Sequence, residues 1–318
     1  MSIKHWPRKI RQHFKHRPGV LAWMLYLPSR AMLALFSLMP YWMLRPLAAN
    51  LGVLALLFER RRRVGREQLA CAFPELSVAE RNKILRASCR SIAMSAVEAM
   101  VLTRRYNSRW QNHIKFDDGA RQLLESYKGK GAILVQAHFG SFEFAGAAMG
   151  PLGLEPAFPM RLPNNYYLGR DLIAARKDGW GVEIIQRQGA VRNLLRRLME
   201  GKSVVIATDQ SAHHNPIFVP WFGKLAATER ATASLALKVG APVIALWAVR
   251  HATKPIWTIG CEVVRDAAEV QDANDENVYN LCCEIHSSLE RQIKLVPEQY
   301  LWIHDRYRIR PDSELTNV

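Results

Sequence analysis

The chain has 318 residues, 49% of them hydrophobic, which excludes a disordered protein and leaves room for one large α/β domain or two small ones. Its 44 Lys and Arg against 28 Asp and Glu give a formal net charge of +16. This charge implies an anionic partner, whether nucleic acid, an acidic membrane surface, an acidic protein or a phosphorylated substrate. The scattered cysteines and the isolated pair His213 and His214 predict neither a metal site nor a cofactor.

Residues 1–18 form a basic N-terminal arm. Trp6, Ile10 and Phe14 recur at four-residue intervals among lysines and arginines. A short amphipathic helix of this kind suits an anionic lipid surface, and a solvated tail is the other interpretation.

Residues 19–44 are strongly apolar, although Arg30 interrupts them and Pro28 lies inside the segment. No charge-free run reaches the roughly 18 residues of a clear membrane-spanning helix. Summed transfer free energies for 19–39 come to about zero, so insertion is marginal. We expect a membrane anchor or an interfacial helix here, followed by one domain at 45–318, with the cluster Arg60 to Arg63 on the cytoplasmic side.

The rest of the chain alternates between strand-like and helix-like segments. Ser77 and Glu80 have the spacing of a capping box at the start of a helix that runs to about Leu102. The other expected helices are 119–127, 191–199 and 230–239, and the expected strands are 133–135, 154–160, 182–186, 203–207 and 242–249. Such alternation predicts an α/β fold with a mostly parallel central sheet and helices on both faces.

A possible catalytic pair follows the first of these strands. The apolar run ends at His138. Gly140 and Ser141 then interrupt the pattern, and Glu143 begins a segment rich in small residues. Side chains five residues apart meet only if a turn separates them, which strand, turn and helix would provide. The carboxylate would then orient the imidazole as a general base, and the amides of Gly140 and Ser141 would stabilise an oxyanion. A hydrogen-bonded core histidine is the plainer alternative.

Polar residues follow two further strands. Arg161, Asn165 and Arg170 come after 154–160, and Asp209 and Gln210 come directly after 203–207. The carboxyl ends of strands are where α/β proteins place ligand contacts, so we expect these residues to bind substrate. A surface arginine at 161 and a turn-capping aspartate at 209 are the ordinary alternatives.

Near the end of the chain, Glu298 to Arg310 interleaves aromatic residues with arginines. Side chains in this pattern stack on nucleic-acid bases or meet lipid headgroups.

Several of these blocks carry a family resemblance. The segment from His138 to Glu143 resembles the His-x4-Glu/Asp motif of glycerolipid-type acyltransferases. The whole chain resembles the bacterial lipid A late acyltransferases, the lauroyl and myristoyl transferases that complete lipid A. The likeness rests on the blocks CAFPELS at 71–77, MRLPNN at 160–165, ATDQ at 207–210, FVPWFG at 218–223 and PEQYLWIH at 297–304.

The resemblance implies a glycerolipid-acyltransferase-like fold and direct transfer of a fatty acyl chain from acyl carrier protein to a hydroxyl of a lipid A precursor. His138 would act as the base and Glu143 would orient it. The partners would be acyl carrier protein, the lipid and the membrane surface, with no nucleic acid. The enzyme would sit at the cell inner membrane with its catalytic domain on the cytoplasmic side. Residues 218–222 are themselves apolar between polar flanks, so they would line an acyl groove or belong to the core.

Three other functions fit parts of the sequence. The acceptor could be a lysophospholipid or another glycolipid. Ser141 could be the nucleophile of a hydrolase, although a Gly-x-Ser-x-Gly elbow is missing around it. A non-catalytic basic protein bound to membrane or nucleic acid would account for the charge but not for the polar residues at the strand ends.

Overall fold

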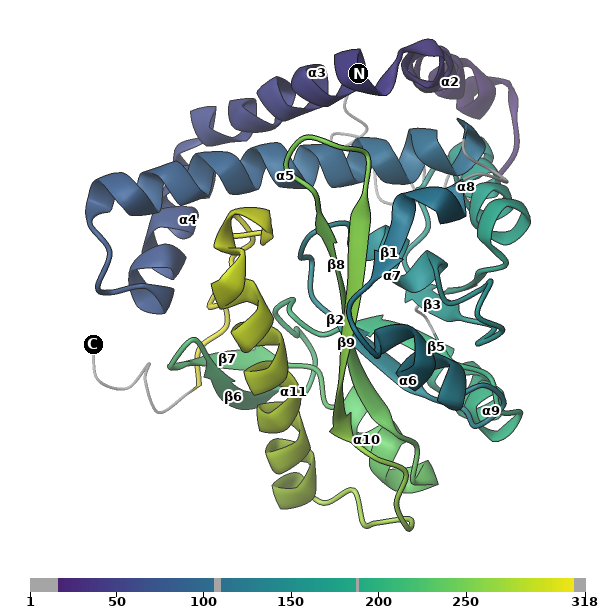
Figure 1. The fold of residues 1–318 in the computed structure, drawn as a ribbon, viewed down its shortest axis with the longest axis vertical. Helices are drawn as coiled ribbons and strands as arrows, with labels where there is room; N and C mark the ends of the chain where they lie inside the picture. Colours follow the sequence, from purple (N-terminus) through teal and green to yellow (C-terminus); the bar gives the residue numbers. More distant parts are fainter. Residues whose placement is uncertain (1–16, 106–109, 187–188, 312–318) are drawn as a thin grey trace.

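The structure is a computed structural model that describes residues 17–105, 110–186 and 189–311 (Figure 1). Nearly all of the predicted N-terminal arm, residues 1–16, therefore lies outside the described residues. The α-helices are α2 (Val20–Leu38), α3 (Tyr41–Val53), α4 (Glu59–Ala72), α5 (Val78–Arg105), α6 (Ala120–Ser126), α7 (Phe142–Ala147), α8 (Tyr166–Trp180), α9 (Ala190–Met199), α10 (Ala231–Val239) and α11 (Asp275–Leu295). Short 3-10 helices are η2 (Leu54–Leu57), η3 (Trp110–His113) and η4 (Pro297–Gln299).

A seven-stranded sheet forms the centre of the molecule. Its strands are β1 (Ile114–Phe116), β2 (Ile133–Gln136), β3 (Ala157–Met160), β4 (Glu183–Gln186), β5 (Val204–Ala207), β8 (Val243–Arg250) and β9 (Trp257–Arg265). The order across the sheet is β1-β9-β8-β2-β5-β3-β4, and every neighbouring pair is parallel except β8 and β9. A separate antiparallel hairpin joins β6 (Ile217–Trp221) to β7 (Lys224–Thr228). The predicted α/β fold with a mostly parallel sheet is confirmed.

Both faces of the sheet are covered, and β2 shows this most directly. All four of its residues are buried. Ile133 and Val135 pack into a core that includes residues of α4, α9, α10 and α11, whereas Leu134 packs into a second core with residues of α6 and α7. Alternate side chains of a strand point to opposite faces, so a continuous apolar run is what a strand between two helical layers requires.

The long helix α5 crosses above the upper end of the sheet in Figure 1, and α2 and α3 form a further layer beyond it. The predicted capping box starts α5: the Ser77 amide donates to the Glu80 carboxylate at 2.8 Å, and the Glu80 amide donates to the Ser77 hydroxyl at 3.3 Å. This reciprocal pair satisfies two amides that the first helical turn leaves without partners.

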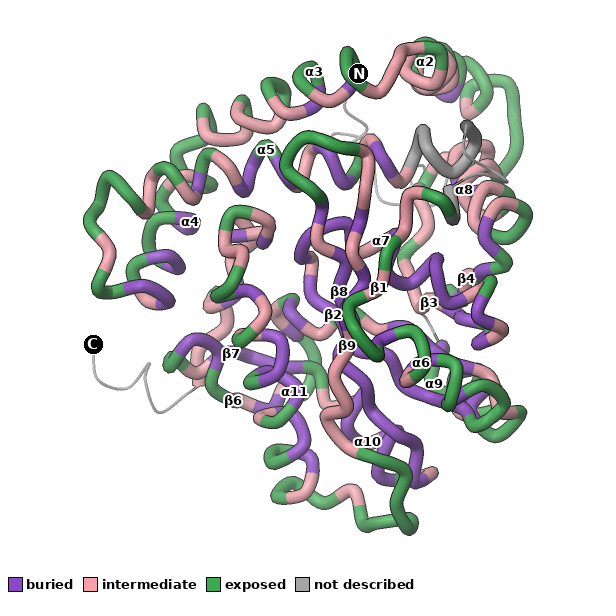
Figure 2. Tube along the Cα trace, viewed as in Figure 1, coloured by how far each residue is buried: buried purple, intermediate pink, exposed green. Residues whose placement is uncertain are grey.

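The apolar N-terminal segment is divided into two helices instead of one. The chain breaks at Met39 and Pro40, between α2 and α3. Among the described residues, α2 is the one helix long and apolar enough to cross a membrane by length and composition. Figure 2 shows that much of its surface is exposed, and the exposed apolar side chains include Val20, Trp23 and Leu35. The protein thus carries an apolar helix that suits membrane association, as predicted.

Candidate active site

The strand pairing of the sheet brings His138 and Asp209 together. β2 and β5 are parallel neighbours, with Gln136 opposite Ala207. His138 and Asp209 each follow two residues later. Two side chains at equivalent positions beyond adjacent parallel strands lie at the same edge of the sheet, and here they are in contact.

Asp209 holds His138 at two points. One carboxylate oxygen lies 2.8 Å from the ring Nδ1 of His138, and the other accepts the His138 backbone amide at 2.9 Å. An acceptor at Nδ1 places the proton of the neutral ring there and leaves Nε2 with a lone pair. This is the tautomer that a general base needs.

The charges of the pair reinforce one another. Burial by itself lowers the pKa of His138, but the charge and hydrogen bond of Asp209, with a further contribution from the charge of Glu143, raise it above the ordinary value of 6.5. Burial would raise the pKa of Asp209, yet its contacts with His138 and the charge of Arg306 lower it to about 2. Asp209 is therefore ionised throughout the physiological range and stabilises a protonated imidazole.

The other ring nitrogen of His138 faces an accessible region. The side-chain amide of Gln210 lies 3.2 Å from Nε2, and the His138 side chain retains 20% of its exposure. The Phe142 ring packs against the imidazole with 4.9 Å between ring centroids. A reacting hydroxyl can therefore approach Nε2 next to Gln210.

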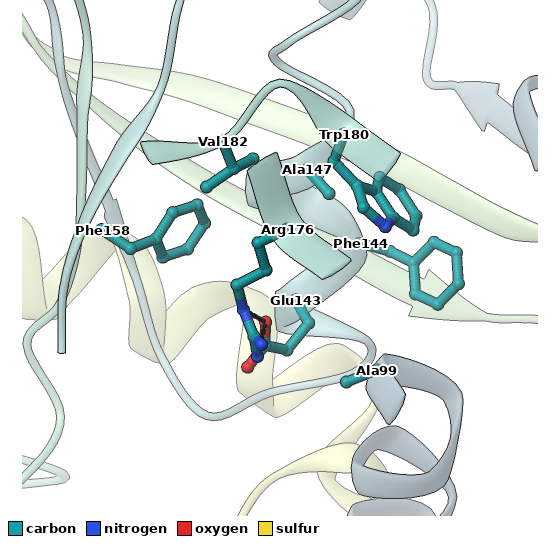
Figure 3. Close-up of a pocket in the computed structure, with 8 residues that line it drawn as sticks. All are labelled: Ala99, Glu143, Phe144, Ala147, Phe158, Arg176, Trp180 and Val182. Carbon is teal, nitrogen blue, oxygen red and sulfur yellow. Dashed lines mark hydrogen bonds and ion pairs between the residues drawn. The ribbon is translucent and has the colours of Figure 1, made fainter. Parts of the chain in front are cut away.

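The structure pairs Glu143 with Arg176 instead of the predicted partner, His138. Glu143 accepts two hydrogen bonds from Arg176 of α8, at 2.7 and 3.1 Å. Figure 3 shows this pair at a small pocket of about 10 Å³ whose other lining residues are apolar, among them Phe158 and Trp180. Glu143 lies in the first turn of α7, where its carboxylate meets α8, and its charge contributes to the raised pKa of His138.

The predicted oxyanion role of Gly140 and Ser141 is not supported by their hydrogen bonds. The Gly140 amide donates to the carbonyl of Gln299 at 2.9 Å, and the Ser141 amide donates to the carbonyl of Ala248 at 2.8 Å. Both amides therefore hold the turn in place, and neither is free to stabilise an oxyanion. The Ser141 side chain is buried and donates to Glu98.

The remaining predicted substrate contacts lie around α8. Asn165 caps that helix, because its side chain accepts the amides of Tyr167 and Leu168. Arg170 lies over the Tyr167 ring and near Asp171, and Arg161 is exposed just beyond β3. The structure thus brings Asp209 and Gln210 to His138, while Asn165 and Arg170 make their contacts within α8 and its neighbours.

The sequence did not reveal what supports the Asp209 loop. Arg306 is fully buried and donates to the carbonyl of Gln210 at 3.1 Å and to the hydroxyl of Thr228 at 2.7 Å. Tyr300 and Trp302 are buried as well. The interleaved aromatics and arginines near the end of the chain therefore include core residues of the site, and the prediction of a base-stacking or headgroup surface was wrong for these three.

Three residues of the block at 218–222 belong to the core, whereas Phe218 is half-buried and Pro220 is exposed. Val219 and Trp221 of β6 have no exposed surface and belong to the larger core, along with Phe222. The Trp221 carbonyl accepts the hydroxyl of Tyr307 at 2.6 Å. These side chains join the hairpin to the C-terminal segment.

Comparisons with known proteins identify the family of the chain. The family model for bacterial lipid A biosynthesis acyltransferases matches residues 9–309. The chain is 27% identical over 312 residues to a lipid A biosynthesis palmitoleoyltransferase of Escherichia coli (strain K12), with 96% of this chain and 97% of the relative covered. It is 27% identical over 282 residues to the lipid A biosynthesis lauroyltransferase of the same organism, covering 86% and 88%. A lipid A biosynthesis acyltransferase of Haemophilus influenzae is 24% identical over 316 residues, with 98% of each chain covered. The chain belongs to the bacterial lipid A biosynthesis acyltransferase family.

Proposed function

We propose that the protein transfers a fatty acyl chain from the thioester of acyl carrier protein to a hydroxyl of a lipid A precursor, with His138 as general base and Asp209 as the residue that orients it. Acyl transfer in lipid A biosynthesis follows from family membership. The donor and the residue roles are our proposal. The observation that supports the roles most strongly is the 2.8 Å contact between Asp209 and Nδ1, which leaves the lone pair of the neutral ring on Nε2, where it can accept a proton.

In the proposed reaction, Nε2 of His138 takes the proton of the acceptor hydroxyl as its oxygen attacks the thioester carbonyl. The negative charge of Asp209 stabilises the imidazolium that forms, and Glu143 adds to this stabilisation at longer range. When the tetrahedral intermediate collapses, the C–S bond breaks and His138 returns the proton to the departing thiolate. The ester forms directly, without an acyl-enzyme.

The charge of the chain supports the proposed partners. Acyl carrier proteins are acidic and lipid A precursors are phosphorylated, so both are complementary to a chain with a net charge of +16. The acylated group would be the 3-hydroxyl of a fatty chain already present on the precursor. A lysophospholipid or another glycolipid is the alternative acceptor.

Mass spectrometry of lipid A from a strain with and without the gene tests the acceptor and the donor together. We expect lipid A from the strain with the gene to carry one more acyl chain, and the mass difference gives the chain length. An unchanged lipid A profile together with a new acylated phospholipid or glycolipid would contradict the proposed acceptor.

A hydrolase that uses Ser141 predicts a different mutational result. Ser141 is only 1% exposed, and its hydroxyl donates to Glu98 at 2.8 Å, so it is poorly placed to attack a substrate. Replacing Ser141 by Ala should leave at least about one third of the acyl transfer rate, whereas loss of a true nucleophile costs on the order of 10⁴ or more. Steady-state transfer to a lipid A precursor measures the difference, and a loss above a thousandfold would favour the hydrolase.

We propose that α2 and α3 attach the enzyme to the inner membrane, with the catalytic domain on the cytoplasmic side. The polar groups of α2 face the domain: Tyr26 donates to Asp171 of α8 at 2.5 Å, and Arg30 lies 3.8 Å from the same carboxylate. Apolar side chains occupy much of the remaining surface of α2. The protein should stay with membranes after a high-salt wash, and release by salt alone would argue against apolar attachment.

A further inference from the structure

The turn that carries His138 is held unusually tightly. Gly140 has a φ of 58°, in the left-handed region, and a Cβ placed there would lie 2.0 Å from the carbonyl oxygen of Ala248. Besides the two amides described above, the carbonyl of His138 accepts the Leu301 amide at 3.1 Å. The backbone of the turn is therefore packed directly against β8 and the segment after η4.

Two side-chain hydrogen bonds tie the same turn to α5. The Ser95 hydroxyl donates to the carbonyl of Gly140 at 2.6 Å, and the Ser141 hydroxyl donates to Glu98 at 2.8 Å. Ser95 and Glu98 lie three residues apart, on neighbouring turns of α5. One face of the long helix thus contacts the turn that immediately follows the catalytic histidine.

Arg250, the last residue of β8, connects these groups. Its guanidinium donates to both oxygens of Glu98 at 2.7 Å, to Ser95 at 2.7 Å and to Ser141 at 2.9 Å. A further bond goes to Ser91 at 2.9 Å. The side chains of Arg250 and Glu98 are 3% and 2% exposed, so their opposite charges are paired away from water.

Two more elements converge on Glu98. Tyr41 of α3 donates to one carboxylate oxygen at 2.9 Å, and the indole of Trp257 at the start of β9 donates to the other at 3.3 Å. A buried ion pair is costly unless its remaining hydrogen-bonding positions are satisfied. Here the hydrogen bonds of Glu98 and Arg250 connect α3, α5, β8 and β9 to the Gly140–Ser141 turn.

We propose that Ser95, Glu98 and Arg250 are positioning residues, which fix the Gly140–Ser141 turn and thereby hold the imidazole of His138 at the angle that acyl transfer needs. This inference rests on the proposed role of His138 as the base. None of the three touches the reacting atoms. Their effect is transmitted through the backbone, where a displacement of about 1 Å at a reacting group can lower a rate roughly a hundredfold.

Two serine replacements test this while they keep the buried ion pair of Arg250 and Glu98, although each also removes one acceptor of the Arg250 guanidinium. Ser95→Ala removes the bond to the Gly140 carbonyl, and Ser141→Ala removes the bond to Glu98. We expect each single variant to lose about threefold in kcat and the double variant about thirtyfold or more, because either link alone still holds the turn. KM for a lipid A precursor should stay within about twofold of the wild-type value.

The control is Ser88→Ala, a buried serine on the same helix whose hydroxyl bonds to the carbonyl of Leu85 instead of the turn. It should lower the melting temperature by no more than the single variants do and keep the wild-type kcat. The assay uses lauroyl and palmitoleoyl thioesters of acyl carrier protein, with His138→Ala in parallel. In the double variant, the acid-side fall of kcat should also move to lower pH as the contact of His138 with Asp209 loosens.

The outcomes distinguish the proposed role of His138 as the base from the proposed positioning role of Ser95, Glu98 and Arg250. An active His138→Ala enzyme would overturn the proposed base, whatever the serine variants do. With His138→Ala inactive, a double variant within about threefold of wild type, or a loss of the same size in Ser88→Ala, would overturn the positioning role alone. A loss of activity that appears only as a raised KM would also overturn the positioning role, because it would indicate a contact with substrate.

Discussion

Replacing Asp209 by Asn is expected to lower kcat by about 10³ to 10⁴, close to the loss for removing His138 itself, with little change in folding. The amide can no longer neutralise an imidazolium. It also presents either its oxygen or its NH₂ group to Nδ1, so the ring is no longer held in the tautomer that leaves Nε2 free. Transfer from acyl carrier protein thioesters to a lipid A precursor measures the effect, and far-UV circular dichroism confirms that the variant is folded.

The same replacement should shift the pH dependence. The pKa of His138 is raised above 6.5, so the unprotonated base, and with it kcat, is lost as the pH falls through that raised value. Asp209 supplies most of the opposing charge, and Glu143 supplies a smaller part. Without the Asp209 charge, burial lowers the pKa of His138, and the acid limb of the residual activity should move to lower pH.

Glu143→Gln is the matched control for this prediction. It removes one carboxylate from the neighbourhood of His138 but leaves the contact with Asp209, so we expect a loss below about tenfold and a smaller displacement of the acid limb. The reverse ranking, with Glu143→Gln nearly inactive and Asp209→Asn nearly normal, would return the orienting role to Glu143.

Replacing Glu98 by Gln should lower the free energy of unfolding by about 3–5 kcal/mol, since it leaves the charge of Arg250 buried without a counterion. The new NH₂ group would also face donors, because both Glu98 oxygens accept hydrogen bonds, from Arg250 and from Tyr41, Ser141 and Trp257. Denaturant titration in detergent, followed by tryptophan fluorescence, measures the change.

Glu125→Gln provides the comparison for Glu98→Gln. Glu125 pairs with Arg121 at 2.9 Å, but the two side chains are 44% and 59% exposed, so water can replace the lost partner. That variant should lose no more than about 1 kcal/mol. If both variants lost the same free energy of unfolding, burial would not explain the contribution of the ion pair between Glu98 and Arg250.

The sequence predicted the sheet well except at the edge formed by β1 and β9. β2, β4, β5 and β8 match expected strands because their apolar runs are short, continuous and bounded by turns. β9 was missed because Gly260 and Glu262 interrupt its pattern and most of its residues are only half-buried. β1 has three residues, too few for any periodicity, and its place is set by pairing with β9.

The site was predicted in part for a related reason. His138 could be found because its signal is local: an apolar run, then an imidazole on a turn. Its carboxylate partner is 71 residues away along the chain and becomes visible only when β2 and β5 are known to be neighbours in register. Glu143 was the nearest acid in sequence, and its actual partner, Arg176, lies on a helix whose packing the sequence does not specify.

The placement of His138 and Asp209 on adjacent strands has a consequence for engineering. β3 and β4 lie on the side of β5 away from β2, so we expect that loops among β3, α8, β4 and α9 can be lengthened or shortened without moving His138 or Asp209. A single residue inserted within β5 would instead rotate the carboxylate to the opposite face of the sheet. Libraries that vary this enzyme should therefore allow changes of length between these strands and keep both strand ends fixed.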